Sequence, residues 1–211
     1  MGHQAAAAAA ATAAEDGVCA DPFTHSSSWC NGHLTAGHGA NIDVPREEDN
    51  RTPLHIAVNE GHTDVVAALL EAGAQAAAGV DEEDEQGLTP LHTAAELGSI
   101  EIAEHLLERG ADLNHAGEPR CITALHVASY HNQEDMVQLL LDKGIKVNVQ
   151  DANGHTPLHI AALLNNHHLI GPLLAAGVDV SLKDKSSKTA QQLALDKGSD
   201  DVLRQLDAFK L

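Results

Sequence analysis

A four-residue motif recurs along this chain at an almost constant interval, and it constrains the fold more than any other feature. The motif reads Thr-Pro-Leu-His or Thr-Ala-Leu-His, and its copies begin at Thr52, Thr89, Thr123 and Thr156. A weaker copy begins at Thr189, and the steps in sequence number from each threonine to the next are 37, 34, 33 and 33. A fixed period of this length indicates a repeat protein, in which one small supersecondary unit is stacked many times.

The residues around each motif predict the content of the unit. Threonine is a good helix N-cap and proline is favoured in the first helical turn, so a helix is expected to begin at each motif. Glycine or asparagine nine residues later, such as Gly61 and Asn165, tolerates the left-handed backbone that ends a helix. A second, amphipathic helix follows, for example over residues 64–70, and a glycine at a constant distance from the threonine ends it in the first four units. Each unit is therefore predicted to be two helices and an extended loop, which bury their apolar faces by stacking.

This pattern resembles the ankyrin-repeat family, in the motif, in the period near 33 and in the run from Gly110 to Asn114. The resemblance covers residues 47–211 and implies an all-α solenoid of four repeats with a C-terminal capping repeat around Thr189. It also implies finger loops and a concave face that binds other proteins. Residues 32–46 read as a degenerate N-terminal cap, because residues 39–43 look like the tail of a leading repeat. Residues 1–31 contain polyalanine and a serine run, and we expect a low-complexity, flexible segment there.

Composition excludes several classes of function. The chain has 12 basic and 31 acidic residues, a formal net charge of −19, and aromatic content is 2%. This balance opposes direct binding to nucleic acid. The longest hydrophobic run is seven alanines, so no membrane span is expected. Three cysteines form no disulfide framework, which favours a reducing compartment, cytoplasmic and alternatively nuclear. We expect a monomer without a cofactor.

Two positions depart from the repeat pattern. Cys121 stands where the other repeats carry Asn50, Gly87 and Gly154, and a cysteine there is expected to strain the turn of the finger. Gly171-Pro172 falls inside the predicted second helix of the fourth repeat. Because an interior proline removes a hydrogen bond, we expect that helix to be bent or shortened.

The histidines and cysteines raise the question of a metal site or of catalysis. The resemblance gives the motif histidines a structural role, hydrogen-bonded within the repeat. Cys121 with nearby His126 could form a nucleophile and base, but no orienting third group is visible and the sequence has no enzymatic motif, so the chain is not expected to be an enzyme. A zinc-binding regulatory protein is the alternative, through an N-terminal group whose spacing matches no strong zinc-finger signature: Cys19, His25, Cys30, His33 and His38.

The main functional prediction is an adaptor or inhibitor that binds a partner protein. In the family, the variable positions lie on the fingers and at the end of each first helix. Leu97, Tyr130, Leu163 and Leu164 would form an apolar stripe there, with Leu88 and Ile122 nearby, although these residues could instead only pack against adjacent helices. The other candidate contact residues are polar or charged: Glu48, Asp49, Arg51, Glu60, Glu85, Glu96, Arg120, His131 and His155.

Two further features carry alternative hypotheses. The acidic run of Asp81, Glu82, Glu83, Asp84 and Glu85 coincides with the longest step of the repeat, and is predicted to be an insertion in a finger. It is either a solvated loop or a contact for a basic partner, consistent with the acidic N-terminal half of the chain. Asn114 lies in a sequence similar to those that asparaginyl hydroxylases modify in ankyrin repeats, so a structural solenoid that is a substrate of such an enzyme is a further alternative function. Otherwise, Asn114 only bonds the loop backbone.

Overall fold

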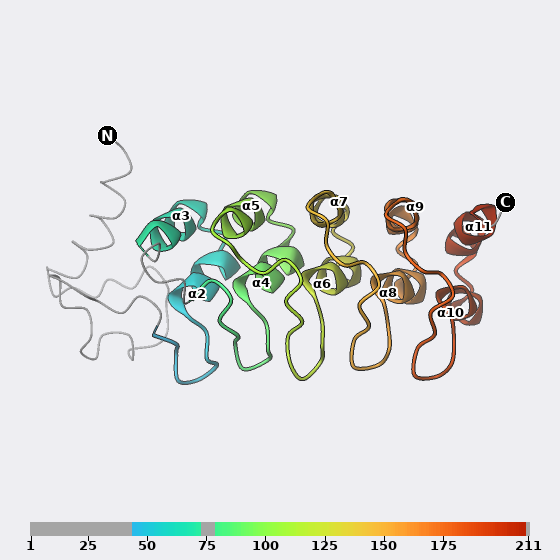
Figure 1. Cartoon of the computed structure of the whole chain (residues 1–211), viewed down its shortest axis with the longest axis horizontal. Helices are drawn as coiled ribbons and strands as arrows, with labels where there is room; N and C mark the ends of the chain where they lie inside the picture. Colours follow the sequence, from blue (N-terminus) through green and yellow to red (C-terminus); the bar gives the residue numbers. More distant parts are fainter. Residues whose placement is uncertain (1–43, 73–78, 210–211) are drawn as a thin grey trace, which may run out of the picture.

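The computed structural model describes residues 44–72 and 79–209, and within these ranges all regular elements are α-helices. The helices form five pairs stacked in one row, which confirms the predicted all-α solenoid (Figure 1). The first helices of the pairs form one layer, the second helices form another, and the loops that connect the pairs project from the side of the first layer. The first helices are α2 (Pro53–Asn59), α4 (Pro90–Leu97), α6 (Ala124–Tyr130), α8 (Pro157–Leu164) and α10 (Ala190–Lys197). The second helices are α3 (Thr63–Ala72), α5 (Ile100–Glu108), α7 (Glu134–Asp142), α9 (His167–Ala175) and α11 (Asp200–Ala208). The predicted low-complexity segment over residues 1–31 lies outside the described ranges, as does most of the predicted N-terminal cap.

The motif threonine is the N-cap of every first helix, as predicted. Its backbone is extended, and its side chain and that of the residue three positions later cap each other's backbone N–H groups. The left-handed residue that stops the helix is also present, for example Gly98 at φ 68° and Asn165 at φ 58°. Local chemistry therefore determines where the first helices begin and end.

The motif histidine links each repeat to the next. In the first repeat the Thr52 N–H donates to His55 Nδ1 at 3.2 Å, and His55 Nε2 lies 2.9 Å from the carbonyl oxygen of Leu88, in the following finger. Because Nδ1 accepts a hydrogen bond, Nε2 must carry the proton and donate it to that carbonyl. The same bridge recurs from His92 to Ile122 O (2.9 Å), from His126 to His155 O (3.1 Å) and from His159 to Lys188 O (3.2 Å).

The fingers are short hairpin-like turns that end just before each motif. In each of the five fingers, the residue two positions before the threonine has a positive φ: Asn50 (56°), Gly87 (76°), Cys121 (52°), Gly154 (79°) and Ser187 (61°). Cys121 thus adopts the left-handed backbone that Gly87 and Gly154 adopt in the adjacent fingers, which is the conformation behind the predicted strain. Neighbouring fingers are joined by backbone hydrogen bonds, such as that from the Ala152 N–H to Arg120 O at 2.8 Å.

A single apolar core runs through the whole stack. The first helices contribute large residues to its centre, Leu91, Leu125 and Leu158 among them, and small residues such as Ala94 and Ala128 where the helices approach each other. The second helices contribute buried leucines, for example Leu106 and Leu140. Each unit therefore buries its apolar face against its neighbours, as repeat stacking requires.

Of the two outcomes predicted for the helix that contains Pro172, bending or shortening, the structure contradicts the shortening. Helix α9 runs from His167 to Ala175 with Pro172 inside, and its nine residues equal the length of α5, α7 and α11. Four of its residues, Leu169, Ile170, Leu173 and Leu174, are buried in the core. Tertiary packing of this apolar face outweighs the one backbone hydrogen bond that the proline removes.

The histidine bridges predict a specific loss of stability in mild acid. Burial lowers the pKa of His55, His126 and His159, and lowers that of His92 to about 4. The unfolded chain then binds protons first, so this contribution to the free energy of unfolding is fully present above pH 6.5. It is lost as the pH falls towards 4, by about 3 kcal/mol for His92 alone. Urea unfolding at pH 7, 6 and 5 should show a falling midpoint.

A glutamine in place of His92 provides the control for this prediction. Gln192 occupies the equivalent position in the last repeat, where its Oε1 accepts the Thr189 N–H at 2.9 Å. His92→Gln keeps that cap but removes a titrating group, so its midpoint should depend less on pH between 7 and 5. A wild-type midpoint that is constant over this range would contradict the predicted pKa shifts.

Substitution by alanine should change the stability of the protein in opposite directions at two glycines that have the same free space but different backbone conformations. A Cβ on Gly171 or on Gly198 would meet nothing within 4 Å, but Gly198 has φ +70° whereas Gly171 lies inside helix α9. Gly171→Ala should stabilise the protein by about 1 kcal/mol, and Gly198→Ala should destabilise it by about 1 kcal/mol. Thermal unfolding should show a higher Tm for the first variant and a lower one for the second; a lower Tm for Gly171→Ala would contradict the helical assignment.

Candidate functional site

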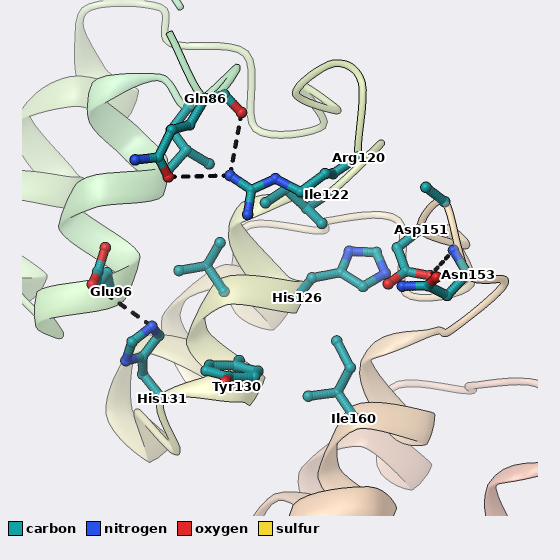
Figure 2. Close-up of a pocket in the computed structure, with 13 residues that line it drawn as sticks. Gln86, Glu96, Arg120, Ile122, His126, Tyr130, His131, Asp151, Asn153 and Ile160 are labelled. Carbon is teal, nitrogen blue, oxygen red and sulfur yellow. Dashed lines mark hydrogen bonds and ion pairs between the residues drawn. The ribbon is translucent and has the colours of Figure 1, made fainter. Parts of the chain in front are cut away.

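A pocket lies where the middle three first helices meet the fingers (Figure 2). Its volume is about 400 Å³, and Tyr130 and His131 at the C-terminal end of helix α6 are among its lining residues. Residues from α4, α6 and α8 and from three successive fingers line it: Gln86, Leu88, Glu96, Arg120, Ile122, His126, Val127, Tyr130, His131, Asp151, Ala152, Asn153 and Ile160. The pocket therefore exists only in the stacked array, because no single repeat supplies its walls.

Apolar side chains form much of the pocket wall, and one aromatic side chain stands exposed at its edge. Val127 and Ile160 are buried, and Ile122 is half-buried. Tyr130, the last residue of α6, is 60% exposed, and its ring lies edge-on to that of His131 with 5.2 Å between centroids. An exposed tyrosine beside an apolar surface is a typical anchor point for a partner protein.

Polar groups at the rim are paired with one another. Arg120 Nη2 donates to the backbone oxygen of Gln86 at 3.3 Å and to its Oε1 at 3.2 Å. His131 Nε2 lies 3.8 Å from Glu96 Oε1 (Figure 2). These contacts join the finger and helix end of one repeat to those of the next at the rim of the pocket.

His126 lies in the pocket wall but is fully engaged in the structural bridge. Its Nδ1 accepts the Thr123 N–H at 3.1 Å and its Nε2 lies 3.1 Å from His155 O. Both ring nitrogens therefore have partners, which leaves neither to act as a base for Cys121, an exposed free thiol in the neighbouring finger.

Only part of the predicted apolar stripe lines the pocket. Tyr130, Ile122 and the buried Leu88 lie in its wall, together with Glu96, Arg120 and His131. Leu97 and Leu164 are each 44% exposed but are not among the lining residues, and neither is the half-buried Leu163. Leu97 and Leu164 lie eight residues after their threonine, whereas Tyr130 lies seven after its own, so these side chains occupy different positions on their helices.

Sequence reasoning did not select two buried apolar residues of the pocket wall, Val127 and Ile160. Both lie four residues after the motif threonine, where Ile56, Thr93 and Leu193 occur in the other repeats. The sequence does contain a signal for this site, because the residue at this position changes from Thr93 to Val127 to Ile160 in the three central repeats. It was missed because an apolar residue directly after the motif histidine resembles a core residue.

The remaining predicted contact residues divide into exposed and internally paired groups. Glu48, Glu60 and Glu85 are exposed. Arg51 pairs with Asp49 at 3.8 Å and with the buried Asp84 at 3.3 Å, across two fingers. His155 lies between Asp151 Oδ2 at 3.6 Å and Asp184 Oδ2 at 3.7 Å, so it too joins neighbouring fingers.

The acidic run does not lengthen the turn of its finger. The Asp84 N–H donates to Leu88 O, and the same bond over the same number of residues joins Asp151 to His155. The additional residues of the longest step therefore precede this turn.

Three of the five acidic side chains in the run form contacts within the chain. Asp84 is buried and accepts from two backbone N–H groups, Glu83 lies 2.7 Å from His115, and Asp81 accepts the Asp112 N–H at 3.0 Å. The other two, Glu82 and Glu85, are exposed. A basic partner could therefore contact only a part of the run.

Asn114 takes part in a second series of links between repeats. Its Oδ1 accepts the Lys146 N–H at 2.8 Å, and Asn148 Oδ1 accepts the Asp179 N–H at 2.8 Å in the next repeat. Asn114 therefore hydrogen-bonds the backbone of a loop, which is one of the two roles predicted for it. Its hydroxylation stays a prediction.

The described ranges contain no candidate metal centre. Across residues 44–72 and 79–209 there is no group of three or more His, Cys, Asp or Glu side chains arranged to hold a metal ion. The zinc candidates Cys19, His25, Cys30, His33 and His38 lie outside the described residues. None of the described helices is long and apolar enough to cross a membrane.

Comparison with known proteins agrees with this geometry. A family model described as ankyrin repeats in three copies matches residues 26–117 and 125–208. A search of curated protein sequences gave no significant match. The family match takes in well over half of the chain, and the helix pairs, fingers and threonine caps follow it throughout the described residues. The chain therefore belongs to the ankyrin-repeat family, whose repeats generally mediate protein–protein interaction.

Proposed function

We propose that the chain is a protein-interaction module, an adaptor or inhibitor, that holds its partner in the pocket beside Tyr130. The observation that carries the proposal is the exposed Tyr130 ring at the edge of an apolar surface formed by Ile122, Val127 and Ile160. Tyrosine is enriched among the residues that dominate binding energy at interfaces. A pocket of about 400 Å³ has room for one or two apolar side chains of a partner.

The array supports this function because the pocket is held in place before any partner arrives. The bridge from His126 to the finger at His155 and the bond from Ala152 N–H to Arg120 O fix two of its walls. Glu96 and His131 approach each other to 3.8 Å at the helix ends. Since these groups lose little conformational freedom on binding, more of the contact energy contributes to affinity.

Charge favours a partner with basic residues beside its apolar anchor. Glu96 lies at the rim, and Glu60, Glu82 and Glu85 are exposed towards the first repeats. The chain as a whole carries a net charge of −19. Such a field accelerates encounter with a basic protein and makes the rate depend on salt.

The test compares Tyr130→Glu with Leu164→Glu in partner capture from an extract of the source cells at high salt. Leu164 is exposed and ends helix α8, but it lies outside the pocket wall, so it is the matched control. We expect the wild type and Leu164→Glu to retain the same partner. Tyr130→Glu should lose it, with an affinity lower by about thirtyfold or more, as for other interface hot spots.

Two outcomes would contradict the proposal. If Tyr130→Glu retained the partner as well as the wild type, the pocket would not be the contact. If every variant captured the partner only at low salt, the exposed glutamates would carry the interaction and Tyr130 would not be its anchor.

A further inference from the structure

The N-terminal end of the stack exposes apolar residues at positions that are buried in every later repeat. Val65, in the first turn of α3, is 37% exposed. Counted from each motif threonine, the residues in the same slot of the following repeats are 0–2% exposed: Ile102, Met136, Leu169 and Val202. Leu69, one helical turn after Val65, is only partly buried, whereas its four equivalents are at most 4% exposed: Leu106, Leu140, Leu173 and Leu206.

The opposite end of the stack shows that a missing neighbour causes such exposure. Leu195 in the last repeat is 67% exposed, while the four residues in its slot, Val58, Ala95, Ser129 and Ala162, are 0% exposed. The two ends expose different slots. The slots of Val65 and Leu69 therefore face the preceding repeat, and the slot of Leu195 faces the following one.

The chain before Thr52 continues the repeat pattern, so a preceding unit can be named. The finger that leads into α2 closes with a bond from the Arg46 N–H to Arg51 O at 2.9 Å, and the finger that leads into α6 closes with the equivalent bond from Gly117 to Ile122. In sequence, Gly39 precedes the threonine of the first motif by the same interval as Gly110 precedes that of the third. The first finger is therefore built in the same way as a finger that follows a complete repeat.

Residues 39–43 also carry the side chains that the tail of a repeat needs. Ala40 follows Gly39 as Ala111, Ile145 and Val178 follow their glycines, and those three are buried in the core. Ile42 corresponds to Leu113, Val147 and Val180, which pack against the core. The ankyrin family match begins at residue 26, so the similarity extends further upstream.

We infer that residues 26–43 form a leading half-repeat that docks on the apolar face of α3 formed by Val65 and Leu69. This face occupies the place of an interface between repeats, and the segment is connected to it directly through the first finger. Docking shields Val65 and Leu69 from water and closes the N-terminal end of the core. The inference is independent of the partner site at Tyr130.

The single tryptophan of the chain, Trp29, lies in this segment and provides the readout in the full-length protein. We expect acrylamide to quench Trp29 less in the native protein than in urea. Val65→Glu should raise the quenching and shift the emission to longer wavelength, because a carboxylate on the face opposes docking. Leu195→Glu is the matched control at the other end of the stack and should leave Trp29 unchanged.

Hydrogen exchange tests the same inference without a fluorescence probe. Amides of residues 26–43 should exchange at least about tenfold more slowly than in a free chain, and Val65→Glu should abolish this protection. The amides of α8 report in the same experiment whether the variant is folded. If Val65→Glu does not fold, Val65→Ala should give a smaller change in the same direction.

Three results would overturn the inference. Trp29 could be as easily quenched in the native protein as in urea, or residues 26–43 could be protected equally in the wild type and in Val65→Glu. A dimer in sedimentation that Val65→Glu dissociates, with residues 26–43 unprotected, would assign the face to a second copy of the chain instead.

Discussion

The hydrogen bond from each motif histidine to a carbonyl oxygen of the next finger is the interaction on which the array depends. It requires a neutral imidazole whose Nδ1 is occupied by the threonine N–H, so that Nε2 must point forward to the following repeat. The same two residues therefore cap a helix and join two repeats. Four such bridges connect the five described helix pairs, and the backbone turns of the fingers are held at a fixed spacing as a result.

The proposed binding surface is a consequence of that spacing. The pocket takes its walls from three successive fingers and three first helices, and each contributes only a few residues. Side-chain links such as those of Arg120 and His155 add rigidity at the fingers, while Asp81 and Asn114 bond the backbone of the following repeat. Function in such an array depends on which residues occupy the repeated slots, because the backbone is nearly the same in every unit.

Much of the fold could be predicted from the sequence because its signals are local. Thr52 and Gly98 show where helices begin and end, and Cys121 marks a left-handed turn by comparison with Gly87 and Gly154. The shortening predicted at Pro172 does not occur, because the packing of the apolar face of α9 is a tertiary effect that helix propensity does not contain.

The lining of the proposed binding pocket could be predicted only in part from the sequence. Tyr130 stands out as an aromatic residue, but Val127 and Ile160 show their role only when adjacent repeats are in place. The burial of Asp84 within the acidic run could not be predicted, since charge alone does not show which carboxylate caps a turn.

Nuclear magnetic resonance of the imidazole nitrogens tests the central claim directly. The account predicts that His55, His92, His126 and His159 are in the neutral form with the proton on Nε2 at pH 7, and that each titrates below the usual range of histidine, with a pKa of about 4 for His92. Nε2–H signals that are coupled across a hydrogen bond to the finger carbonyls would support the bridge. Protonation of these rings at an ordinary pKa, or a proton on Nδ1, would contradict the claim that they join one repeat to the next.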